Sequence, residues 1–412
     1  MKTLLDQQTL IIYLEGRIDQ QNAESVKAQM EAAISQNPAE HLQLDATDLS
    51  YISSMGFRLL LDIAKQRKEK ISIVNVKPEI MDIFQTTGFT ELFLVRKPLR
   101  QISIEGLKEI GSGLSAQVYQ LDAERIIKVY RPLPSNTPTF IEHERNISKE
   151  IFLKGIPTAI PFEVVKVGER MGVIYEMLNA TVLSEYISAH PEALDDIIAK
   201  EVALLKKIHN VHFSHSILPS VKHRIVTGVR ALLADLLSAD ELDAYENAMA
   251  EIPDTDTMLH GDYNPRNIMI DQKGELMLID IGSACVGHPV FDFVTMMPFS
   301  RRLKGIMSPR EMFFADPNAT EEAFQKKLEM DAAACDIWRR LLSVYFDVRD
   351  EKALDRIEDS MMVYSYGTYL YIFSLLLSGQ RNVFVDGLLR KLYDCFIARR
   401  DEIGRLSEWW KV

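Results

Sequence analysis

The feature that most constrains this sequence is a polar loop followed by two short apolar segments. The loop spans His260–Asn267 and leads directly into the apolar run Ile268–Ile270. A polar connection that contains Gly274 leads to a second apolar run, Leu276–Ile279, which is followed by Asp280. Two short apolar runs joined by a glycine-containing turn predict a β-hairpin. Such a hairpin brings the loop and Asp280 close together although they are separated in the sequence.

The polar side chains of this region suit phosphoryl transfer. Asp262 offers a carboxylate that can orient an attacking hydroxyl, while Asn267 and Asp280 offer oxygen ligands for Mg²⁺ on nucleotide phosphates. Residues of these types are also common turn formers, which alone would account for Asn264-Pro265. Turn formation does not account for Asp280, because an unpaired carboxylate at the end of an apolar run is costly. We therefore predict a catalytic site here.

Three motifs of this region resemble those of the aminoglycoside phosphotransferase family of kinase-like enzymes. They are HGDxxxxN over His260–Asn267, the pair Ile279-Asp280, and GHPVFD, which ends at Asp292. The resemblance implies that Asp262 is the catalytic base and that Asn267 and Asp280 are the two Mg²⁺ ligands. It also implies that His260 and Asp292 support the catalytic loop.

The composition is that of an ordinary soluble globular protein. The chain has 412 residues, enough for two or three domains, with 47% hydrophobic and 26% charged residues. The net charge of −12 argues against general nucleic-acid binding and slightly favours a cationic substrate. The three cysteines are too few and too scattered for a disulfide framework or a zinc site, which fits a reducing compartment.

The sequence shows no sign of export or of a membrane span. The first residues lack the long apolar run of a signal peptide. The longest apolar segment late in the chain, Tyr369–Leu377, is too short to cross a bilayer. We therefore expect a cytoplasmic protein without a nucleic-acid partner.

Residues 1–97 alternate between strand and helix patterns. Strands are predicted at 10–14, 42–45 and 71–74, and helices at 22–35, 55–66 and 78–84. Pro78 suits the first turn of the last helix, and Gly88 follows its end. This alternation predicts a small α/β domain with helices packed on a mixed sheet.

Two hydroxyl side chains, Ser53 and Ser54, stand where the helix near Met55 is predicted to begin. Serine is a preferred N-cap residue and needs no other reason to be there. A phosphate on Ser54 would also be stabilised by the positive end of that helix. The residues themselves leave both interpretations open, and the two are compatible.

The first part of the chain resembles the STAS domain of anti-sigma-factor antagonists. The matching motifs are GRID over Gly16–Asp19, ISSxG ending at Gly56, NVxP ending at Pro78, and Gly88 after a helix. The resemblance covers nearly all of residues 1–97. It implies that Ser54 is a regulatory phosphorylation site and that the domain has a protein partner. Many members carry Asp directly before the acceptor serine, whereas this chain has Ser53.

A second domain is expected after a short linker at 97–100, with 101–106 predicted as its first strand. Gly111 and Gly113 allow a tight turn and a close approach of the backbone to phosphates, although any hairpin can use two glycines. Lys128 then stands among apolar residues in a predicted strand, where a lysine is usually on an exposed face. This order resembles the ATP-binding lobe of kinases, which implies that Lys128 contacts the nucleotide phosphates.

That lysine needs an acidic partner on the following helix, predicted at 140–154. Three acids, Glu142, Glu144 and Glu150, lie on it. Glu144 fits the family spacing best and Glu142 is second; each of the three also suits an exposed helix face. The strand 173–178 resembles the hinge whose backbone meets adenine, which places Glu176 at the nucleotide.

The remainder, residues 179–412, is predicted to be mostly helical. Helices are expected at 194–209, 221–237, 239–250, 324–346, 353–378 and 382–406. Four histidines, His209, His212, His215 and His223, are interpreted as loop residues rather than a metal cluster. The acids of the late helices could line a pocket for an amine, but a solvated helix face is the default interpretation. They are Asp331, Asp336, Asp347, Asp350, Glu351, Asp355, Glu358 and Asp359.

We therefore expect an α/β STAS domain at 1–97 and an α+β, two-lobed, protein-kinase-like fold with lobes at 101–178 and 179–412. The first functional hypothesis is an enzyme that uses ATP and Mg²⁺ to phosphorylate a hydroxyl group of a small molecule. The second is a protein kinase-type switch that acts on a STAS domain, including its own Ser54. Gly261, where protein kinases carry Arg, favours the first hypothesis, and the fused STAS domain with its short linker favours the second. A nucleotide-binding switch without turnover is a third, weaker hypothesis.

Overall fold

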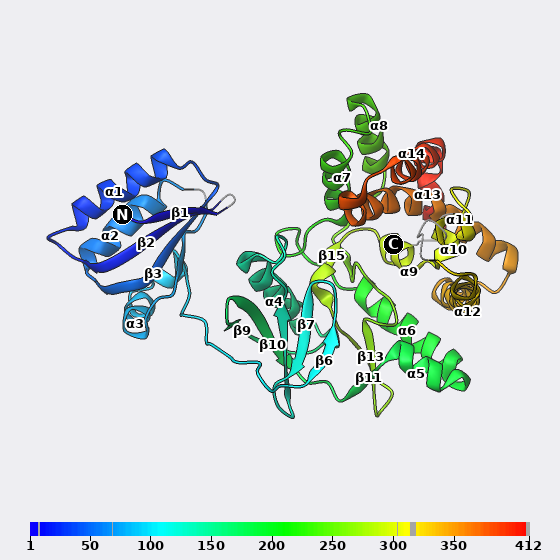
Figure 1. Ribbon diagram of the computed structural model, residues 1–412, viewed down its shortest axis with the longest axis horizontal. Coiled ribbons are helices and arrows are strands. Elements are labelled where there is room, and N and C mark those ends of the chain that lie inside the picture. The colour runs from blue at the N-terminus through cyan, green and yellow to red at the C-terminus, as the bar shows by residue number, and fades with distance from the viewer. Residues whose placement is uncertain (7–8, 68, 303, 314–318, 409–412) are drawn as a thin grey trace. The chain divides into compact units, whose positions relative to one another are not determined.

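The computed structural model describes residues 1–6, 9–67, 69–302, 304–313 and 319–408 (Figure 1). The chain divides into two compact units, which are described separately. The first comprises residues 1–104 together with 164–171, and the second comprises 105–163 and 172–412. In the described residues, no helix is both long enough and apolar enough to cross a membrane.

The first unit is built on a mixed five-stranded sheet in the order β1-β2-β3-β4-β5. The pair β1–β2 is antiparallel and the other pairs are parallel. The elements are β1 (Thr3–Asp6), β2 (Thr9–Ile18), α1 (Ala23–Gln36), β3 (His41–Ile52), α2 (Ser54–Ala64), β4 (Ser72–Val74), α3 (Pro78–Thr86), η1 (Phe89–Glu91) and β5 (Leu94–Val95). The apolar faces of strands and helices meet in one core that includes the fully buried Ile12, Leu44, Leu60 and Phe84. The expected α/β architecture is confirmed.

A second five-stranded sheet, in the order β6-β7-β8-β10-β9, lies within residues 109–176 together with one long helix, α4; its segment 164–171 is counted with the first unit. The pairs β6–β7, β7–β8 and β8–β10 are antiparallel. The bounds are β6 (Glu109–Ser112), β7 (Ala116–Gln120), β8 (Arg125–Tyr130), α4 (Pro138–Leu153), β9 (Pro161–Val167) and β10 (Arg170–Glu176). Thr137 caps α4 by accepting from the backbone of Phe140, and Pro138 occupies the first turn.

The rest of the second unit is mainly helical and has two small sheets, β11-β13-β14 and β12-β15. The strands are β11 (Ala180–Val182), β12 (Met258–Leu259), β13 (Ile268–Asp271), β14 (Leu276–Leu278) and β15 (Cys285–Val286). The helices are α5 (Leu183–Ala189), η2 (Pro191–Ala193), α6 (Leu194–His209), α7 (Val221–Leu232), α8 (Ala239–Ala250), η3 (Ile281–Ser283), α9 (Val290–Met296), α10 (Phe299–Arg302), α11 (Pro309–Phe313), α12 (Glu321–Phe346), α13 (Glu351–Leu376), η4 (Ser378–Gln380), α14 (Val383–Ala398) and η5 (Arg400–Glu408).

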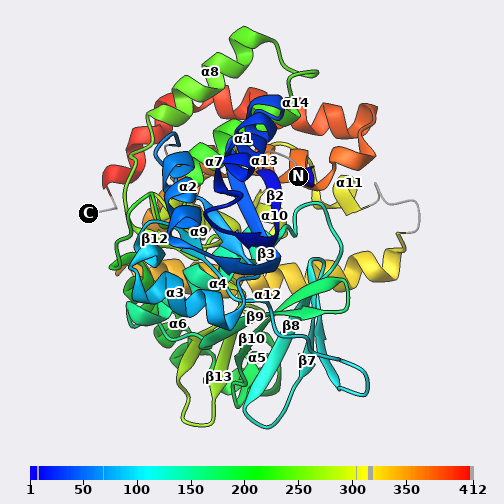
Figure 2. The ribbon, with the colours of Figure 1, turned by 90° about the vertical axis from the view of Figure 1, so that its left-hand side faces the viewer.

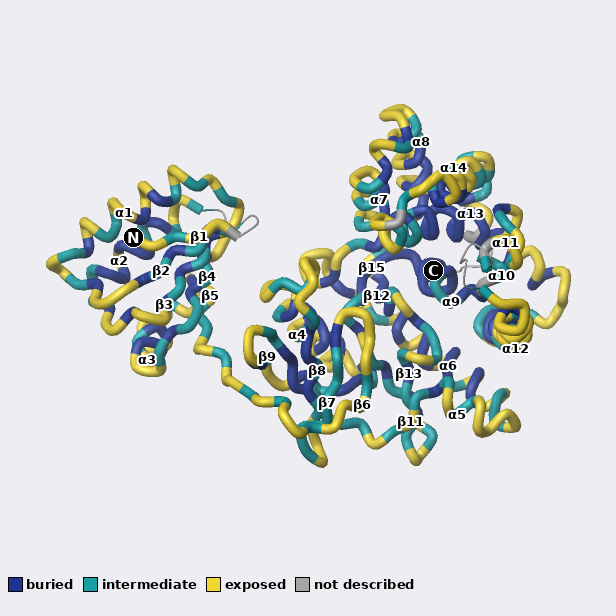
Figure 3. Tube along the Cα trace, viewed as in Figure 1, coloured by how far each residue is buried: buried dark blue, intermediate teal, exposed yellow. Residues whose placement is uncertain are grey.

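Helix α13 is the centre of this helical part. It contacts α7, α9, α10, α12 and α14, and much of its length is buried (Figure 3). Helix α12 is seen end-on in Figure 1 and from the side in Figure 2. The apolar core therefore fixes the late helices relative to the loop that follows β12, because β12 belongs to the same cluster of buried residues.

Several expected elements differ from the structure. The strand predicted at 101–106 is wrong: only Gln101 forms a bridge, with Lys166, and Gly106 takes a left-handed φ of 78° that ends any extended run. The helix predicted at 221–237 is too long: it ends at Leu232, and the next helix begins after Ser238, which caps it through a capping box. The segment 382–406 divides into α14 and η5. Strand β1 was not predicted, because its two leucines, Leu4 and Leu5, are both exposed and do not alternate.

Candidate active site

The predicted hairpin is confirmed. Ile268 of β13 pairs with Leu278 of β14, and Gly274 supplies the left-handed φ of 78° in the turn between them. The polar loop lies between the end of β12 at Leu259 and the start of β13. The loop is closed by Asn267, whose Nδ2 donates to Oδ2 of Asp262 at 2.9 Å. The two residues predicted as base and metal ligand are therefore adjacent.

The carboxylate of Asp262 is oriented from one side by two amides. Nδ2 of Asn264 donates to its Oδ1 at 3.2 Å, and Asn267 holds Oδ2. Burial raises the pKa of Asp262 above its ordinary value; the neighbouring His260 and the bond from Asn267 oppose this rise, and the charge of Asp280 adds to it. Asp262 is thus an oriented carboxylate with an increased affinity for a proton, as a general base requires.

Asp280 lies just beyond β14 in the left-handed conformation, with φ 55° and ψ 50°. Its Oδ1 accepts from Nζ of Lys128 at 2.8 Å, and its side chain is 57% exposed. Burial alone would raise the pKa of Asp280, but Lys128 outweighs it and the pKa is lowered. The carboxylate is not an unpaired charge in an apolar strand, as its sequence position suggested, because the strand ends at Leu278.

Lys128 is the link between the sheet and the loop region. Its Nζ donates to Oε1 of Glu144 at 2.7 Å as well as to Asp280. Burial lowers the pKa of Lys128, but the charges of these two carboxylates outweigh it and the net shift is upward. Within the described chain, neither Glu142 nor Glu150 forms an ion pair with Lys128. Of the three predicted acids, Glu144 is therefore the partner.

Glu144 is 5% exposed and packs directly on Gly282. A Cβ built on Gly282 would lie 2.8 Å from Cδ of Glu144, so a side chain at this position would displace the carboxylate. Gly282, two residues after Asp280, thus allows α4 to approach the end of β14. This contact aligns Glu144, Lys128 and Asp280 in one row.

The backbone of the catalytic loop is held by Asp292, which is completely buried. Its Oδ1 accepts from the backbone N–H of Gly261 at 2.8 Å and its Oδ2 from that of His260 at 3.0 Å. Nε2 of His209 lies 3.2 Å from the same Oδ2, and Nδ1 of His209 lies 2.9 Å from the hydroxyl of Tyr345. A chain of hydrogen bonds therefore runs from α12 through α6 and α9 to the loop.

The interpretation of His209 as a loop residue was wrong. It is the last residue of α6 and is 9% exposed. Its position on the buried stripe of that helix, one and two turns after the buried Leu205 and Glu201, is the sequence signal that could have identified it.

His260 supports the loop and takes no part in proton transfer to solvent, because it is fully buried. The backbone N–H of Asp262 donates to its Nδ1 at 3.3 Å, so the ring proton is on Nε2, which donates to the carbonyl of Ile279 at 3.3 Å. The imidazole therefore ties the loop to the end of the hairpin.

The glycine of the HGD motif is required by packing. Gly261 has a left-handed φ of 79°, and a Cβ there would lie 2.2 Å from the backbone oxygen of Ser283. Neither an arginine nor an alanine fits without moving the backbone. The difference from the protein kinase motif at this position is thus a property of the local fold.

The two glycines of the predicted phosphate loop are not required by the fold in this way. Neither Gly111 nor Gly113 has a left-handed φ, and the nearest atoms to a Cβ would be 3.7 Å and 3.8 Å away. Their lack of side chains instead leaves open space beside the loop, as a phosphate-binding turn needs. Arg131 braces this loop: its Nη2 donates to Oγ of Ser112 at 2.9 Å and its Nε to the carbonyl of Gly113 at 3.1 Å.

Glu176 ends β10, where the hinge was predicted. Its Oε2 accepts from the backbone N–H of Ile160 at 3.2 Å, and its own N–H donates to the carbonyl of Ile160 at 3.0 Å. The N–H of Met177 donates to the backbone carbonyl of Glu124 at 2.7 Å. The side chain of Glu176 thus has a structural partner in the backbone of Ile160.

The donor set suits Mg²⁺ better than a transition metal. In the described residues, no group of three or more His, Cys, Asp or Glu side chains could hold a metal ion. Asn267 and Asp280 instead offer one amide and one carboxylate oxygen near Asp262. Mg²⁺ is usually held by one or two carboxylates together with phosphates and water, so these residues fit it.

In the first unit, Ser53 is the N-cap of α2, and its side chain accepts from the backbone of Gly56 at 3.4 Å. Ser54, the first helical residue, is exposed. The glycine of the motif is again set by packing, because a Cβ on Gly56 would lie 2.7 Å from Cγ1 of Ile52. The capping role thus falls to Ser53 and leaves Ser54 at the surface.

Comparison with known proteins agrees with both resemblances. The phosphotransferase enzyme family matches residues 106–326, and the STAS domain family matches residues 2–102. The anti-sigma factor antagonist BtrV of Bordetella bronchiseptica is 33% identical over 89 residues, which cover 21% of this chain and 76% of that protein.

Two solved structures illustrate the structural neighbours. The streptomycin–ATP–APH(2")-IIa ternary complex covers 78% of this chain and 99% of its own, with 14% identity and a TM-score of 0.45. The ethanolamine kinase of Plasmodium vivax covers 72% of this chain and 83% of its own, with 16% identity and a TM-score of 0.43. The family match extends over more than half of the chain. The chain therefore belongs to the phosphotransferase enzyme family, and it carries a STAS domain at residues 2–102.

Proposed function

We propose that the protein transfers the γ-phosphate of ATP, with Mg²⁺, to a hydroxyl group of a small molecule in the cytoplasm. Residues 101–178 would form the nucleotide lobe and 179–412 the catalytic and acceptor lobe, while the STAS domain at 1–97 regulates or recruits the enzyme. The observation that carries the proposal is that Lys128 bonds both Glu144 and Asp280 at 2.7 and 2.8 Å.

Each residue of the site has a defined part in this reaction. Gly111, Gly113 and Lys128 would hold the phosphates of the nucleotide, and the backbone at Glu176 would meet its base. Asn267 and Asp280 would hold Mg²⁺, which when bound neutralises the charge that develops on the phosphates.

The acceptor hydroxyl is oriented by Asp262, whose carboxylate can take the proton as the oxygen attacks. Glu144 keeps Lys128 charged and in place, and Asp292 and His260 keep the loop backbone fixed. Catalysis is thus mainly positioning and charge neutralisation.

The test is ADP release by the purified protein with Mg²⁺, ATP and hydroxylated small molecules. Release should depend on an acceptor and on Mg²⁺, and Asp262→Asn should lose it while still binding nucleotide. Equal release by Asp262→Asn would contradict the assignment of the base.

A second candidate function, a protein kinase-type switch that acts on a STAS domain, is favoured by the exposure of Ser54 at the first turn of α2. Its test is the intact mass of the protein after incubation with Mg²⁺ and ATP, beside Asp262→Asn. A gain of one phosphate that maps to Ser54 and is absent from the variant supports this function. An unchanged mass together with acceptor-dependent ADP release supports the small-molecule reaction.

A further inference from the structure

The phosphate loop, residues 111–115, is bonded to the segment that directly follows β8. Arg131 is the first residue of that segment, and its side chain contacts the loop twice. Its Nε donates to the carbonyl of Gly113 at 3.1 Å, and its Nη2 donates to Oγ of Ser112 at 2.9 Å. The carbonyl of Ser115 accepts from the backbone N–H of Arg131 at 2.8 Å. The same carbonyl accepts from Nδ2 of Asn136 at 2.9 Å. Arg131 therefore holds the loop on both sides of its tip.

The tip of the loop, at Leu114, keeps free backbone N–H groups. Leu114 is 89% exposed, and no acceptor for its N–H or for that of Ser115 is found in the described residues. In a planar trans peptide the C=O and N–H groups point in opposite directions. The N–H of Leu114 thus points away from Arg131, because the carbonyl of Gly113 in the same peptide points toward it. Successive free N–H groups in a turn suit the oxygens of a phosphate.

The charge of Arg131 is not neutralised by the protein. Its side chain donates to a neutral carbonyl and to a hydroxyl, and within the described residues it has no carboxylate partner. A guanidinium carries five N–H donors and stays charged at all ordinary pH values. Arg131 therefore adds a positive charge beside the loop while two of its donors hold the loop in shape.

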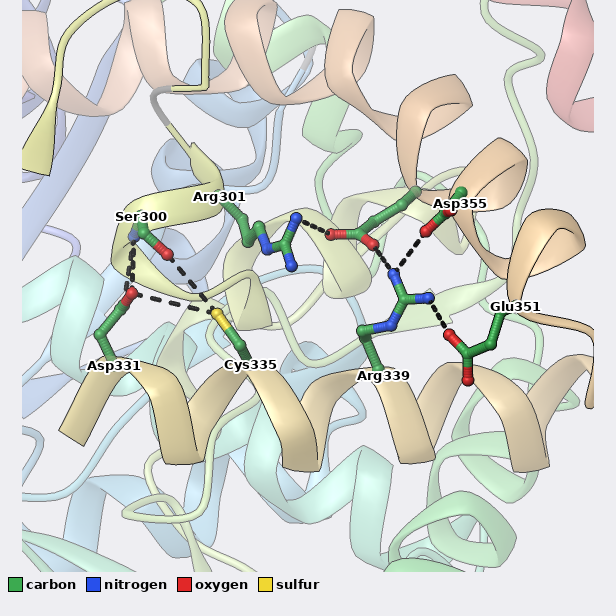
Figure 4. A network of polar contacts seen from close by, with 8 residues as sticks. Ser300, Arg301, Asp331, Cys335, Arg339, Glu351 and Asp355 are labelled. Atoms are coloured by element: carbon green, nitrogen blue, oxygen red, sulfur yellow. Dashed lines mark hydrogen bonds and ion pairs between the residues drawn. The ribbon is translucent and has the colours of Figure 1, made fainter. Parts of the chain in front are cut away.

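The arginines of the late helices differ, because their charges are already paired. Figure 4 shows Arg339 of α12, which forms ion pairs with three carboxylates, those of Glu351 at 2.5 Å, Asp355 at 2.9 Å and Glu358. Glu358 is 7% exposed. Asp331 is 8% exposed and accepts from the backbone N–H of Ser300 at 3.1 Å. The interpretation of these acids as a simple solvated face is corrected in part, because they are partners of arginines and of a helix start.

The contacts of Arg131 also extend to the helix that carries Glu144. Nδ2 of Asn136 donates to the carbonyl of Arg131 at 3.0 Å as well as to the loop. The next residue, Thr137, is the N-cap of α4. The phosphate loop, the end of β8 and the start of α4 are thus joined at Arg131 and Asn136.

We propose that Arg131 is a positioning residue for the phosphates of the nucleotide. It holds the loop so that the N–H groups of Leu114 and Ser115 face the phosphates, and its charge strengthens their attraction. The inference rests on the proposed function and adds a residue outside the phosphate loop to its nucleotide site. These groups act on phosphate and not on the nucleoside. Arg131 should therefore contribute to the binding of ADP and ATP and not to that of adenosine.

The test measures how ADP and adenosine compete with ATP in the full-length protein, with Mg²⁺ and an acceptor. Arg131→Gln should raise the KM for ATP and the inhibition constant of ADP by roughly tenfold or more, because charge-assisted contacts are lost. The inhibition constant of adenosine and kcat at saturating ATP should stay within about threefold. Equal weakening of ADP and adenosine would mean that the whole nucleotide site is disturbed, and it would overturn the inference.

Two further variants separate charge, shape and folding. Arg131→Lys keeps the charge but loses the planar donor group, so it should give an intermediate affinity for ADP. Arg125→Gln is the matched control, because Arg125 lies at the other end of β8 and pairs with the exposed Asp122; it should change nothing. Wild-type affinity for ADP in both Arg131 variants would also refute the inference. Failure of the proposed function is separate: the wild-type protein would then release no ADP with any acceptor, and ADP binding measured by calorimetry would still test Arg131.

Discussion

The row of charges at the candidate active site and the charge network of α12 and α13 use the same residue types in opposite ways. At the site, the ammonium of Lys128 is paired with the carboxylates of Glu144 and Asp280, Asp262 adds a further negative charge near Asp280, and the Asp280 side chain is 57% exposed. In the network of Figure 4, Arg339 is 20% exposed and forms ion pairs with three carboxylates, those of Glu351, Asp355 and Glu358. Glu358 also forms an ion pair with Arg301.

The difference is the surplus of negative charge that stays open to solvent at the site. A divalent cation that arrives with a nucleotide can neutralise this surplus. The carboxylates of the network are instead neutralised by the protein's own arginines. Substitutions in the first region should therefore change turnover with little effect on folding, and substitutions in the second should change folding with little effect on turnover.

The largest expected effect is that of Asp280→Asn, which removes the ligand charge and the Lys128 partner but keeps the shape. We expect kcat to fall roughly 10³-fold, because one group that stabilises developing charge is lost. Glu351→Gln, an exposed acid of the network, should keep kcat within about twofold. The measurement is ADP release at saturating substrates, with thermal unfolding as the check of folding. Similar kcat values for both variants would remove the distinction between the two regions.

Replacing the glycine of the catalytic loop should lower both turnover and stability. Gly261→Ala places a Cβ 2.2 Å from a backbone oxygen at a φ of 79°, so we expect a loss of about 3 kcal/mol in unfolding free energy together with the loss of turnover. Gly274→Ala is the matched control: its φ is 78°, but the nearest atom is the end of the flexible Lys200 side chain at 2.8 Å. It should cost about 1 kcal/mol and spare kcat. Urea titration measures the unfolding free energy, and ADP release measures kcat. Equal effects of Gly261→Ala and Gly274→Ala would mean that the φ angle alone matters.

Within the network, Arg339→Met should destabilise the protein by about 2 kcal/mol, because Glu358 is buried and loses one of its two arginines. The methionine retains the apolar part of the side chain, so packing is preserved. Arg340→Met removes pairs with Asp195 and Asp336, which are 87% and 57% exposed, and should cost less than about 1 kcal/mol. Urea titration would show the order of the two. A lower kcat in Arg339→Met at unchanged stability would assign the network to the reaction.

The charged residues of the candidate active site could be predicted from the sequence, because each of them departs from the local pattern in which it stands. Asp280 after an apolar run, Lys128 inside a strand and the HGD loop each stood out against a pattern that explained their neighbours. The bounds of α6 and α8 were predicted to the residue, because their apolar spacing is regular and their ends are marked by a polar turn.

The network could not be predicted in the same way, since its partners come from different helices. Nothing in the spacing of Glu358 shows that Arg301, 57 positions earlier, reaches it at 3.2 Å. The partners of His209 were missed for the same reason: the spacing of α6 marks His209 as buried, but its role depends on Asp292 and Tyr345, which are brought to it only by packing of α6, α9 and α12. Long-range pairing of charged and polar groups is a property of the folded chain and leaves no periodic signal.

The smallest expected effect concerns the hydrogen-bond chain that joins the two regions, from Tyr345 on α12 to the catalytic loop. Tyr345→Phe removes the hydroxyl that bonds Nδ1 of His209 at 2.9 Å, and His209 still has Asp292, so kcat should fall only about threefold. His209→Gln should cost more, about tenfold, because the carboxylate that holds the loop backbone then loses a partner directly. KM for the acceptor should stay constant in both variants, since neither residue touches substrate. Tyr186→Phe on α5 is the control, because its ring packs on His190 and no hydrogen bond of its hydroxyl is found in the described residues. A fall in stability that matches the fall in kcat would show that Tyr345 only packs against α6, whereas a loss of kcat at constant stability would show that α12 positions the catalytic loop.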